Sequence, residues 1–141
     1  MLLISACLLG CACRYDGKSK PHPLAVELAR RGLAVPVCPE QLGGLPTPRK
    51  PSERRGGRVV MADGRDVTAE YRRGAEATLH LARLYGCTAA VLKERSPSCG
   101  KGQIYDGTFT GTLTAGDGVT AELLTAGGIK VYGESKLEKL L

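Results

Sequence analysis

Six cysteines are the residues of this chain best suited to chemistry, and three of them occupy equivalent positions. Cys7, Cys38 and Cys99 each come shortly after a short apolar run that is typical of a buried strand. Thiolates are nucleophiles and soft metal ligands. In an open parallel sheet, sites form at the carboxyl ends of the strands, where loops converge. The spacing therefore predicts that these three thiols meet at one edge of a sheet.

Three thiolates at one site favour some cofactors over others. Zinc prefers four ligands and often takes histidine, but the chain has only His22 and His80, and neither lies in a ligand-like cluster. An iron–sulfur cubane is commonly held by four thiolates, so three would leave one iron exposed as a Lewis acid for a soft donor. From spacing alone, separate packing of the cysteines with nothing bound stays open.

The other three cysteines give weaker signals. Cys11 and Cys13 lie in the loop after the first apolar run, close to the predicted site, where they are ligands, redox partners or bystanders. Cys87 lies between a predicted helix and a predicted strand, at the opposite edge of the sheet, and we interpret it as a buried packing residue.

Strand and helix patterns alternate along the chain. The clearest helix repeats Val67, Tyr71, Ala75 and Ala82 at steps that place them on one face. Alternation at this spacing predicts an α/β fold, a Rossmann-like open parallel sheet sandwiched by helices, as a single domain over residues 1–141. The predicted strands are 2–6, 33–37, 88–93 and 129–133, and the predicted helices are 23–32, 66–86 and 117–128.

Two further segments do not follow that alternation. Residues 39–65 are rich in Pro, Gly and Arg, which predicts a long ordered loop. Within it, the basic run 49–58 is interpreted as solvated, with attraction of phosphate or nucleic acid as the alternative. Alternating Thr, Tyr and Phe near Gly predict a β-hairpin over 103–113.

Composition indicates a protein of the cytoplasm that does not associate with a membrane. The formal net charge is +6, and no apolar stretch is long enough to span a bilayer. The apolar N-terminal stretch has no basic residue before it, unlike a secretion signal, because the first one is Arg14. In a reducing compartment six cysteines indicate metal binding or catalysis instead of disulfides.

The loops around the predicted site contain long motifs, and together they cover nearly the whole chain. By these motifs the sequence resembles the thiouracil desulfidase family, long known as a bacterial domain of unknown function. The segments that carry the resemblance are SACLLG (5–10), RYDG (14–17), VCPEQLGGLPTPR (37–49), LKERSPSCG (92–100), IYDGTFTG (104–111) and GDGVTA (116–121).

The resemblance implies a 4Fe–4S cluster with three cysteine ligands and one open iron. By motif match, Cys7, Cys38 and Cys99 carry over as those ligands. The implied reaction converts the thiocarbonyl of a thiolated uracil to a carbonyl and releases sulfide, without net redox change. A base, a nucleoside, a nucleotide and a thiolated tRNA are all compatible substrates, and the sequence specifies neither the fate of the sulfide nor the oligomeric state.

Side chains near the cysteines supply candidate catalytic groups. Attack of water on the ring carbon needs a base, and Glu40, two residues after Cys38, is the best placed by sequence. Ser96 and Ser98, which flank Pro97, are candidates to orient the water or to bind a ring group. Shaping of the loop is the alternative role for both serines.

Four charged residues are candidates for substrate binding: Arg14, Asp16, Lys93 and Glu94. Arg14 suits a carbonyl or a phosphate, with a solvated role as its alternative. Asp16 precedes Gly17, so a turn role competes with substrate binding. Lys93 and Glu94 end a predicted strand and either line the pocket or form surface ion pairs.

Two other classes of function remain open from the sequence. One is a thiol–disulfide or persulfide-handling enzyme that uses Cys11 and Cys13, or Cys7 with one of them, as a redox pair. The other is a non-catalytic metal-binding or tRNA-binding module in which the basic run 49–58 contacts RNA.

Overall fold

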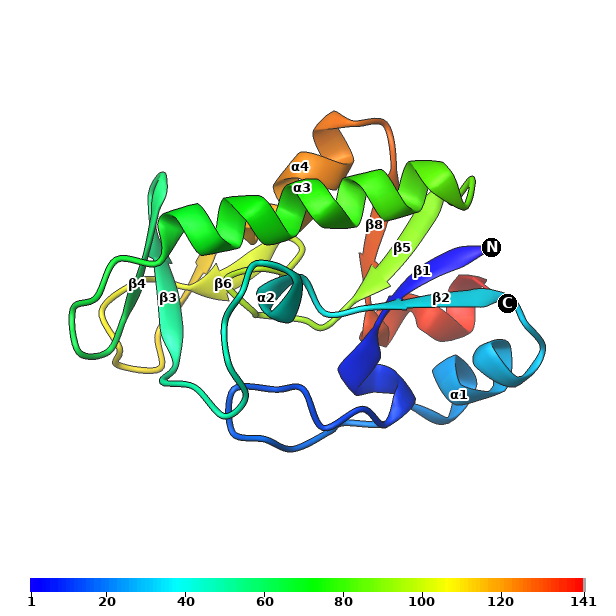
Figure 1. The fold of residues 1–141 in the computed structure, drawn as a ribbon, viewed down its shortest axis with the longest axis horizontal. Helices are drawn as coiled ribbons and strands as arrows, with labels where there is room; N and C mark the ends of the chain where they lie inside the picture. Colours follow the sequence, from blue (N-terminus) through cyan, green and yellow to red (C-terminus); the bar gives the residue numbers. More distant parts are fainter. Residues whose placement is uncertain (141) are drawn as a thin grey trace.

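A parallel sheet of four short strands forms the centre of the computed structural model, which describes residues 1–140 (Figure 1). The strand order is β2-β1-β5-β8, and all three neighbouring pairs are parallel. This confirms the predicted α/β class and its open parallel sheet. The strands are β1 (Leu2–Ser5), β2 (Ala34–Val37), β5 (Ala89–Leu92) and β8 (Lys130–Gly133).

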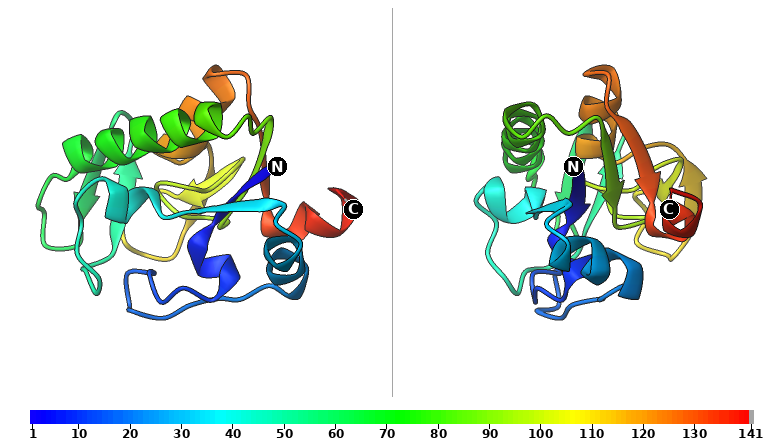
Figure 2. Two further views of the ribbon diagram at one scale, coloured as in Figure 1. Left: turned by 45° about the vertical axis from the view of Figure 1, so that its right-hand side comes forward. Right: turned by 90° about the vertical axis from the view of Figure 1, so that its right-hand side faces the viewer.

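Helices cover both faces of the sheet, and the alternation of side chains along the strands explains why. Leu3 and Ala90 pack on the face beneath α3 and α4, whereas Ile4 and Val91 pack on the face beneath α1 and η2 (Figure 2). The central strands β1 and β5 are buried on both sides, as apolar runs predict, whereas the edge strands β2 and β8 each have an exposed residue. The helical segments are η1 (Ala6–Leu9), α1 (Pro23–Arg30), α2 (Pro39–Leu42), α3 (Thr68–Leu84), α4 (Val119–Ala126) and η2 (Glu134–Leu140).

The prediction of a loop over 39–65 is wrong. The segment contains the short helix α2 and an antiparallel hairpin of β3 (Ser52–Arg55) and β4 (Arg58–Met61). Val59 and Met61 of β4 pack against Tyr71 of α3 in a small core of their own. The strand pattern was hidden because β3 is almost entirely polar and the hairpin buries only one face.

The predicted hairpin over 103–113 is confirmed, with its second strand shifted along the chain. Strand β6 spans Gln103–Tyr105 and pairs with β7, which spans Leu113–Ala115. A loop of residues 106–112 joins the two strands. Within residues 1–140, no helix has the length and apolar character needed to cross a membrane.

Helices α2 and α3 cross at very close range because glycine stands at both contact points. A Cβ atom on Gly43 would lie 2.0 Å from the carbonyl oxygen of Glu70, and one on Gly74 would lie 1.9 Å from that of Pro39. Both distances are far inside van der Waals contact. Since α2 begins directly after Cys38 and carries Glu40, this crossing positions two of the predicted site residues.

Replacing Gly74 with alanine is therefore expected to destabilise the protein. Overpacking against a backbone that cannot move away typically costs about 1–3 kcal/mol in the free energy of unfolding. Gly57→Ala is the matched control, because a Cβ there meets nothing within 4 Å. Urea unfolding followed by circular dichroism measures both variants. Equal midpoints for Gly74→Ala and the wild type would show that the two helices are not packed this closely.

Candidate metal centre and active site

A cavity of about 590 Å³ opens beyond the carboxyl ends of β1, β2 and β5. Its walls come from the segments that follow these strands, from the hairpin β3–β4 and from the loop between β6 and β7. The edge of the sheet predicted to hold a site is thus the edge that opens into this cavity.

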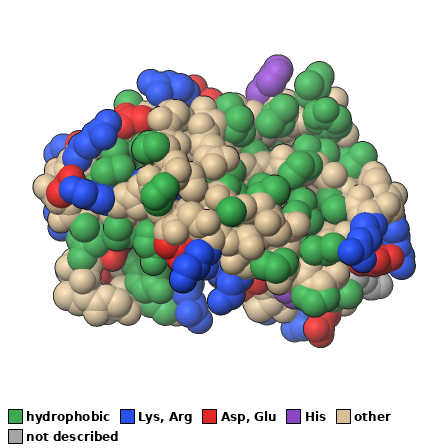
Figure 3. All heavy atoms as spheres, turned by 60° about the horizontal axis from the view of Figure 1, so that its bottom comes forward, with side chains coloured by type: hydrophobic (Ala, Val, Ile, Leu, Met, Phe, Trp, Pro, Cys, Tyr) green, Lys and Arg blue, Asp and Glu red, His purple; other side chains and the backbone are tan. Residues whose placement is uncertain are grey.

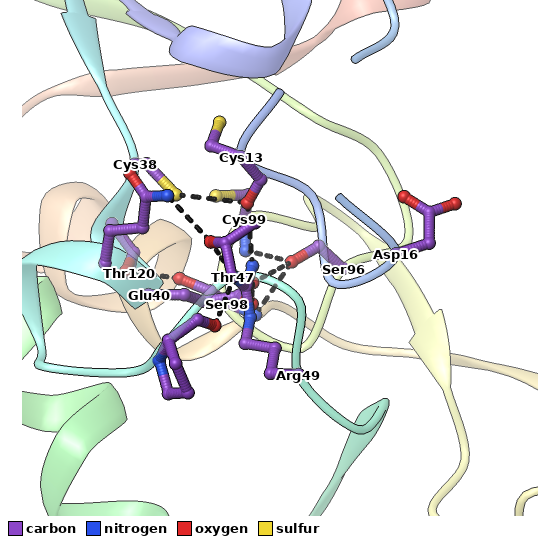
Figure 4. Close-up of polar contacts among 12 residues, drawn as sticks. Cys13, Asp16, Cys38, Glu40, Thr47, Arg49, Ser96, Ser98, Cys99 and Thr120 are labelled. Carbon is purple, nitrogen blue, oxygen red and sulfur yellow. Dashed lines mark hydrogen bonds and ion pairs between the residues drawn. The ribbon is translucent and has the colours of Figure 1, made fainter. Parts of the chain in front are cut away.

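Four cysteine residues line this cavity: Cys7, Cys13, Cys38 and Cys99. They include all three cysteines predicted from the strand ends. The Cys38 thiol donates toward Cys13, with its Sγ 3.8 Å from the Cys13 carbonyl oxygen (Figure 4). Cys13 therefore lies among the candidate ligands, although it is 25 residues from Cys38 in sequence.

The remaining two cysteines lie elsewhere. Cys11 is exposed and does not line the cavity. Cys87 is buried beside Ala82 and Ile129 in the core between the sheet and α3. The structure thus supports the interpretation of Cys87 as a packing residue away from the site.

The surroundings of Cys13, Cys38 and Cys99 raise the pKa of each thiol and keep it protonated when no cation is near. Burial and the neighbouring Glu40 carboxylate raise the pKa of Cys99 to about 12. The hydroxyls of Ser98 and Ser5 act in the opposite direction and lower this pKa, but by less. The contact with Cys38 lowers the pKa of Cys13, but the contact with Cys7 and burial outweigh it and raise the value to about 11. Metal binding must displace such protons, so these sulfur atoms become thiolates as a metal group binds.

The four thiols that line the cavity are a donor set of the kind that binds an iron–sulfur cluster. Among residues 1–140, no group of three His, Cys, Asp or Glu side chains is arranged to hold a metal ion. In a cluster each cysteine binds a different iron, so the sulfur atoms lie around a larger body. Neither histidine lines the cavity, and His22 instead caps α1 by accepting the Leu24 N–H at 3.2 Å. An all-thiol, partly buried set is the kind that holds such clusters.

Glu40 is fixed in the cavity wall by a buried arginine. Arg49 approaches Glu40 Oε2 with Nη2 at 2.6 Å and Nε at 2.8 Å, and its side chain is only 4% exposed. The same guanidinium donates to the carbonyl of Cys13 at 3.0 Å and to the hydroxyl of Thr47 at 3.0 Å. Arg49 thereby ties the candidate base to the loop that carries one of the thiols.

The two candidate serines have different positions. Ser96 lines the cavity, and its Oγ donates to Glu40 Oε1 at 3.4 Å while it accepts the N–H groups of Ser98 and Cys99, both at 3.1 Å. Ser98 is buried behind Cys99, does not line the cavity, and shares a hydrogen bond of 2.8 Å with Thr120. Only Ser96 therefore joins the carboxylate to the turn that presents Cys99.

Arg14, Lys93 and Glu94 line the cavity as predicted, but two of them are already paired. Lys93 Nζ lies 2.8 Å from Glu134 of η2, and Glu94 Oε1 accepts the Ser135 N–H at 2.8 Å. These two side chains fasten the C-terminal segment to the end of β5.

Asp16 does not line the cavity. It is exposed, its Oδ1 accepts the Lys18 N–H at 3.0 Å, and its carboxylate points away from the other labelled side chains (Figure 4). This is the geometry of a turn stabilised by an aspartate. The structure supports its turn role.

The interpretation of the basic run 49–58 as solvated is wrong for Arg49 and Arg54 and holds for Arg55 and Arg58, which are exposed. Arg49 is buried against Glu40. Arg54 donates to the Asp117 carbonyl at 2.7 Å, and Arg55 donates to the Gly107 carbonyl at 2.7 Å. These side chains are used to join the hairpin to the neighbouring loops.

The cavity nevertheless carries a surplus of positive charge. Six basic residues line it against three acidic ones, Glu40, Glu53 and Glu94. Basic side chains also gather near the lower centre of the face shown in Figure 3, next to apolar ones. A positive surplus favours anionic ligands in the cavity. The six are Arg14, Lys20, Arg49, Lys50, Lys93 and Arg95.

Three residues of the cavity wall were not predicted as site residues from the sequence. Tyr71 belongs to the apolar face of α3, Glu53 lies in the charged strand β3, and Phe109 lies in a loop rich in Gly and Thr. Burial raises the pKa of Tyr71, with a further contribution from the Glu40 charge, so its phenol stays neutral. Each reaches the cavity through tertiary packing that the local pattern does not encode.

Comparisons with known proteins agree with this geometry. The sequence matches the 2-thiouracil desulfurase family model over residues 2–136. It is 44% identical over 151 aligned positions to the uncharacterized protein YbbK of Bacillus subtilis (strain 168), covering the whole of both chains. A solved structure, described as the 4Fe–4S-dependent thiouracil desulfidase TudS, superimposes with a TM-score of 0.95 at 50% identity, covering 99% of this chain and 93% of that one.

Proposed function

Because the chain belongs to the 2-thiouracil desulfurase family, we propose that it replaces the thiocarbonyl sulfur of a thiolated uracil with oxygen and releases sulfide. The similar solved structure is itself described as a thiouracil desulfidase, which supports this activity. Thiocarbonyl and carbonyl carbon have the same formal oxidation state, so hydrolysis needs no external electron donor.

We further propose that Cys7, Cys38 and Cys99 hold a 4Fe–4S cluster. Their shared position at the cavity, the burial of Cys7 and Cys99, and the absence of histidine from the cavity wall support this assignment. When bound through three thiolates, the cluster supplies one open iron, a Lewis acid that suits a soft sulfur donor. Cys13 lines the same cavity and is not one of the three proposed ligands.

Glu40 is the proposed general base. Its carboxylate lines the cavity, and Arg49 holds Oε2 while Oε1 faces the Ser96 hydroxyl. A base must lie within hydrogen-bond reach of the proton it takes, directly or through one water. A water bound between Glu40 and Ser96 would be held for attack on the ring carbon, and Glu40 would then return the proton to the leaving sulfide.

The basic residues of the cavity wall are the proposed source of substrate binding. Arg14 lines the cavity and has no side-chain partner among the described residues, so it is free to hold a ring carbonyl or an anionic substituent. A neutral base offers Arg14 only a ring carbonyl, whereas a nucleotide offers both a ring carbonyl and a phosphate. Base, nucleoside and nucleotide all remain within the proposal.

One observation carries the proposed function: the candidate thiols and the arginine-held carboxylate line a single cavity. Anaerobic reconstitution with iron and sulfide tests it. The expected product is brown protein with about four irons per chain that converts 2-thiouracil to uracil with equimolar sulfide and no added reductant. Fully loaded protein that leaves 2-thiouracil, its nucleoside and its nucleotide intact would overturn the proposal.

A thiol–disulfide enzyme is a second candidate, because Cys7, Cys13 and Cys38 line one cavity and the Cys38 Sγ lies 3.8 Å from the Cys13 carbonyl oxygen. Two adjacent thiols are the requirement for a redox pair. Protein that stays colourless after anaerobic reconstitution, yet reduces disulfides with a dithiol donor, would favour this candidate. An RNA-binding role for the run 49–58 has less support, since Arg49, Arg54 and Arg55 are held by internal contacts.

A further inference from the structure

Phe109, the only phenylalanine of the chain, has a backbone conformation that bulky residues rarely adopt. Its φ is +58°, and its side chain lines the cavity. Left-handed φ is unfavourable for a residue with a large Cβ substituent, and glycine would adopt it freely. Such strain persists only where the surroundings impose it, commonly at ligand sites.

A buried carboxylate imposes this conformation. Glu53 of β3 is 9% exposed, and its Oε1 accepts the N–H groups of Gly107 at 2.9 Å and Phe109 at 3.2 Å. A charged acceptor makes strong hydrogen bonds to backbone N–H groups, which offsets the cost of burying it. The loop 106–112 is thereby fixed to the hairpin β3–β4 at two successive points.

Arg55, two residues after Glu53 on the same strand β3, also holds this loop. Its Nε donates to the Gly107 carbonyl at 2.7 Å, and its guanidinium carbon lies 5.9 Å from the centroid of the Phe109 ring. This is the range of a cation–π contact. The ring is therefore held in the cavity wall by its own backbone, by Glu53 and by Arg55.

We propose that Phe109 is a specificity-determining residue whose ring stacks on the pyrimidine of the substrate, and that Glu53 is the residue that positions it. The inference rests on the proposed function, since it takes a thiolated uracil as the ligand. An aromatic ring held in place offers a planar apolar surface, and stacking on such a surface is a general way to bind a nucleobase. Phe109 provides such a surface from the loop 106–112.

Phe109→Gly is the decisive variant. Glycine relieves the left-handed strain, so the free energy of unfolding is expected to stay equal to that of the wild type or to rise. Without the ring, the KM for 2-thiouracil and the inhibition constant of uracil are both expected to rise about tenfold or more. Phe109→Tyr keeps the ring and should keep both constants. Unchanged constants in a folded Phe109→Gly protein would overturn the proposal.

Glu53 is tested by a conservative pair. Glu53→Gln keeps an oxygen that accepts both N–H groups and should change KM little, whereas Glu53→Ala releases the loop and should raise KM without a matching fall in kcat. Iron content of each variant shows whether the metal site is intact. A fall in kcat with KM unchanged in Glu53→Ala would show that Glu53 does not act through substrate binding.

The two proposals can fail separately. If the wild-type holoprotein desulfurates no thiolated uracil, the proposed function is wrong. Calorimetric titration of uracil into the wild type and Phe109→Gly then still tests the stacking surface. Equal affinity of both proteins for uracil would reject the role of Phe109, whatever the activity.

Discussion

Replacing Cys7, Cys38 or Cys99 with serine is expected to abolish both iron binding and sulfide release. A serine hydroxyl is a harder donor than a thiol and does not ionise near neutral pH, so each replacement removes one thiolate ligand. The three proposed ligands follow three different strands, and neither histidine lines the cavity to substitute for one of them. Iron per chain after anaerobic reconstitution, with visible absorbance and sulfide release, measures the effect.

Three cysteines that fall outside the proposed ligand set are the controls. Cys11 is exposed and Cys87 packs in the core beneath α3, so serine at either position should leave the iron content unchanged. Cys13→Ser is the sharper control, because Cys13 lines the same cavity as the three proposed ligands. Retention of about four irons by Cys13→Ser supports three ligands and an open iron. Loss of the cluster in that variant would show that a fourth cysteine closes the site.

Glu40→Gln is expected to lower kcat by about 10²–10⁴, the usual contribution of a positioned general base, while the iron content stays intact. The amide has the shape of the carboxylate and keeps one oxygen to accept from Arg49, while its NH2 group replaces the oxygen that faces Ser96, and it takes up no proton. The measurement is single-turnover formation of uracil from 2-thiouracil by protein whose iron content has been matched to that of the wild type.

An exposed pair supplies the control for this variant. Glu27 forms an ion pair with Arg31 on the surface of α1, so Glu27→Gln should leave kcat unchanged. If Glu40→Gln keeps a kcat within a few-fold of the wild type at full iron content, Glu40 only holds Arg49 in place and another group takes the proton.

The central sheet and the meeting of three thiols were predictable because both follow from short-range patterns. Apolar runs of four to six residues separated by helices indicate parallel strands, and the carboxyl ends of parallel strands share one edge. Cys7, Cys38 and Cys99 needed no further information to be placed at that edge. The structure confirms that they line one cavity, while their role as ligands stays a prediction.

The polar part of the site was less accessible to sequence reasoning. The contact of Arg49 with Glu40 and the approach of Cys13 to Cys38 depend on how the segment after α2 folds back on the first loop. Charged strands such as β3 carry no apolar alternation, so the hairpin and its Glu53 were hidden. Asp16 is the opposite case. It belongs to a long motif and was a candidate for substrate binding, but it stabilises a turn outside the cavity.

The contact between α2 and α3 also limits how this protein can diverge during evolution. The atoms that face Gly43 and Gly74 are main-chain carbonyls, which cannot rotate aside as a flexible side chain would. Homologues that keep this crossing should therefore retain glycine at both positions, even where their substrates differ. Substitution at these two positions is thus limited by the short distance between the main chains of α2 and α3.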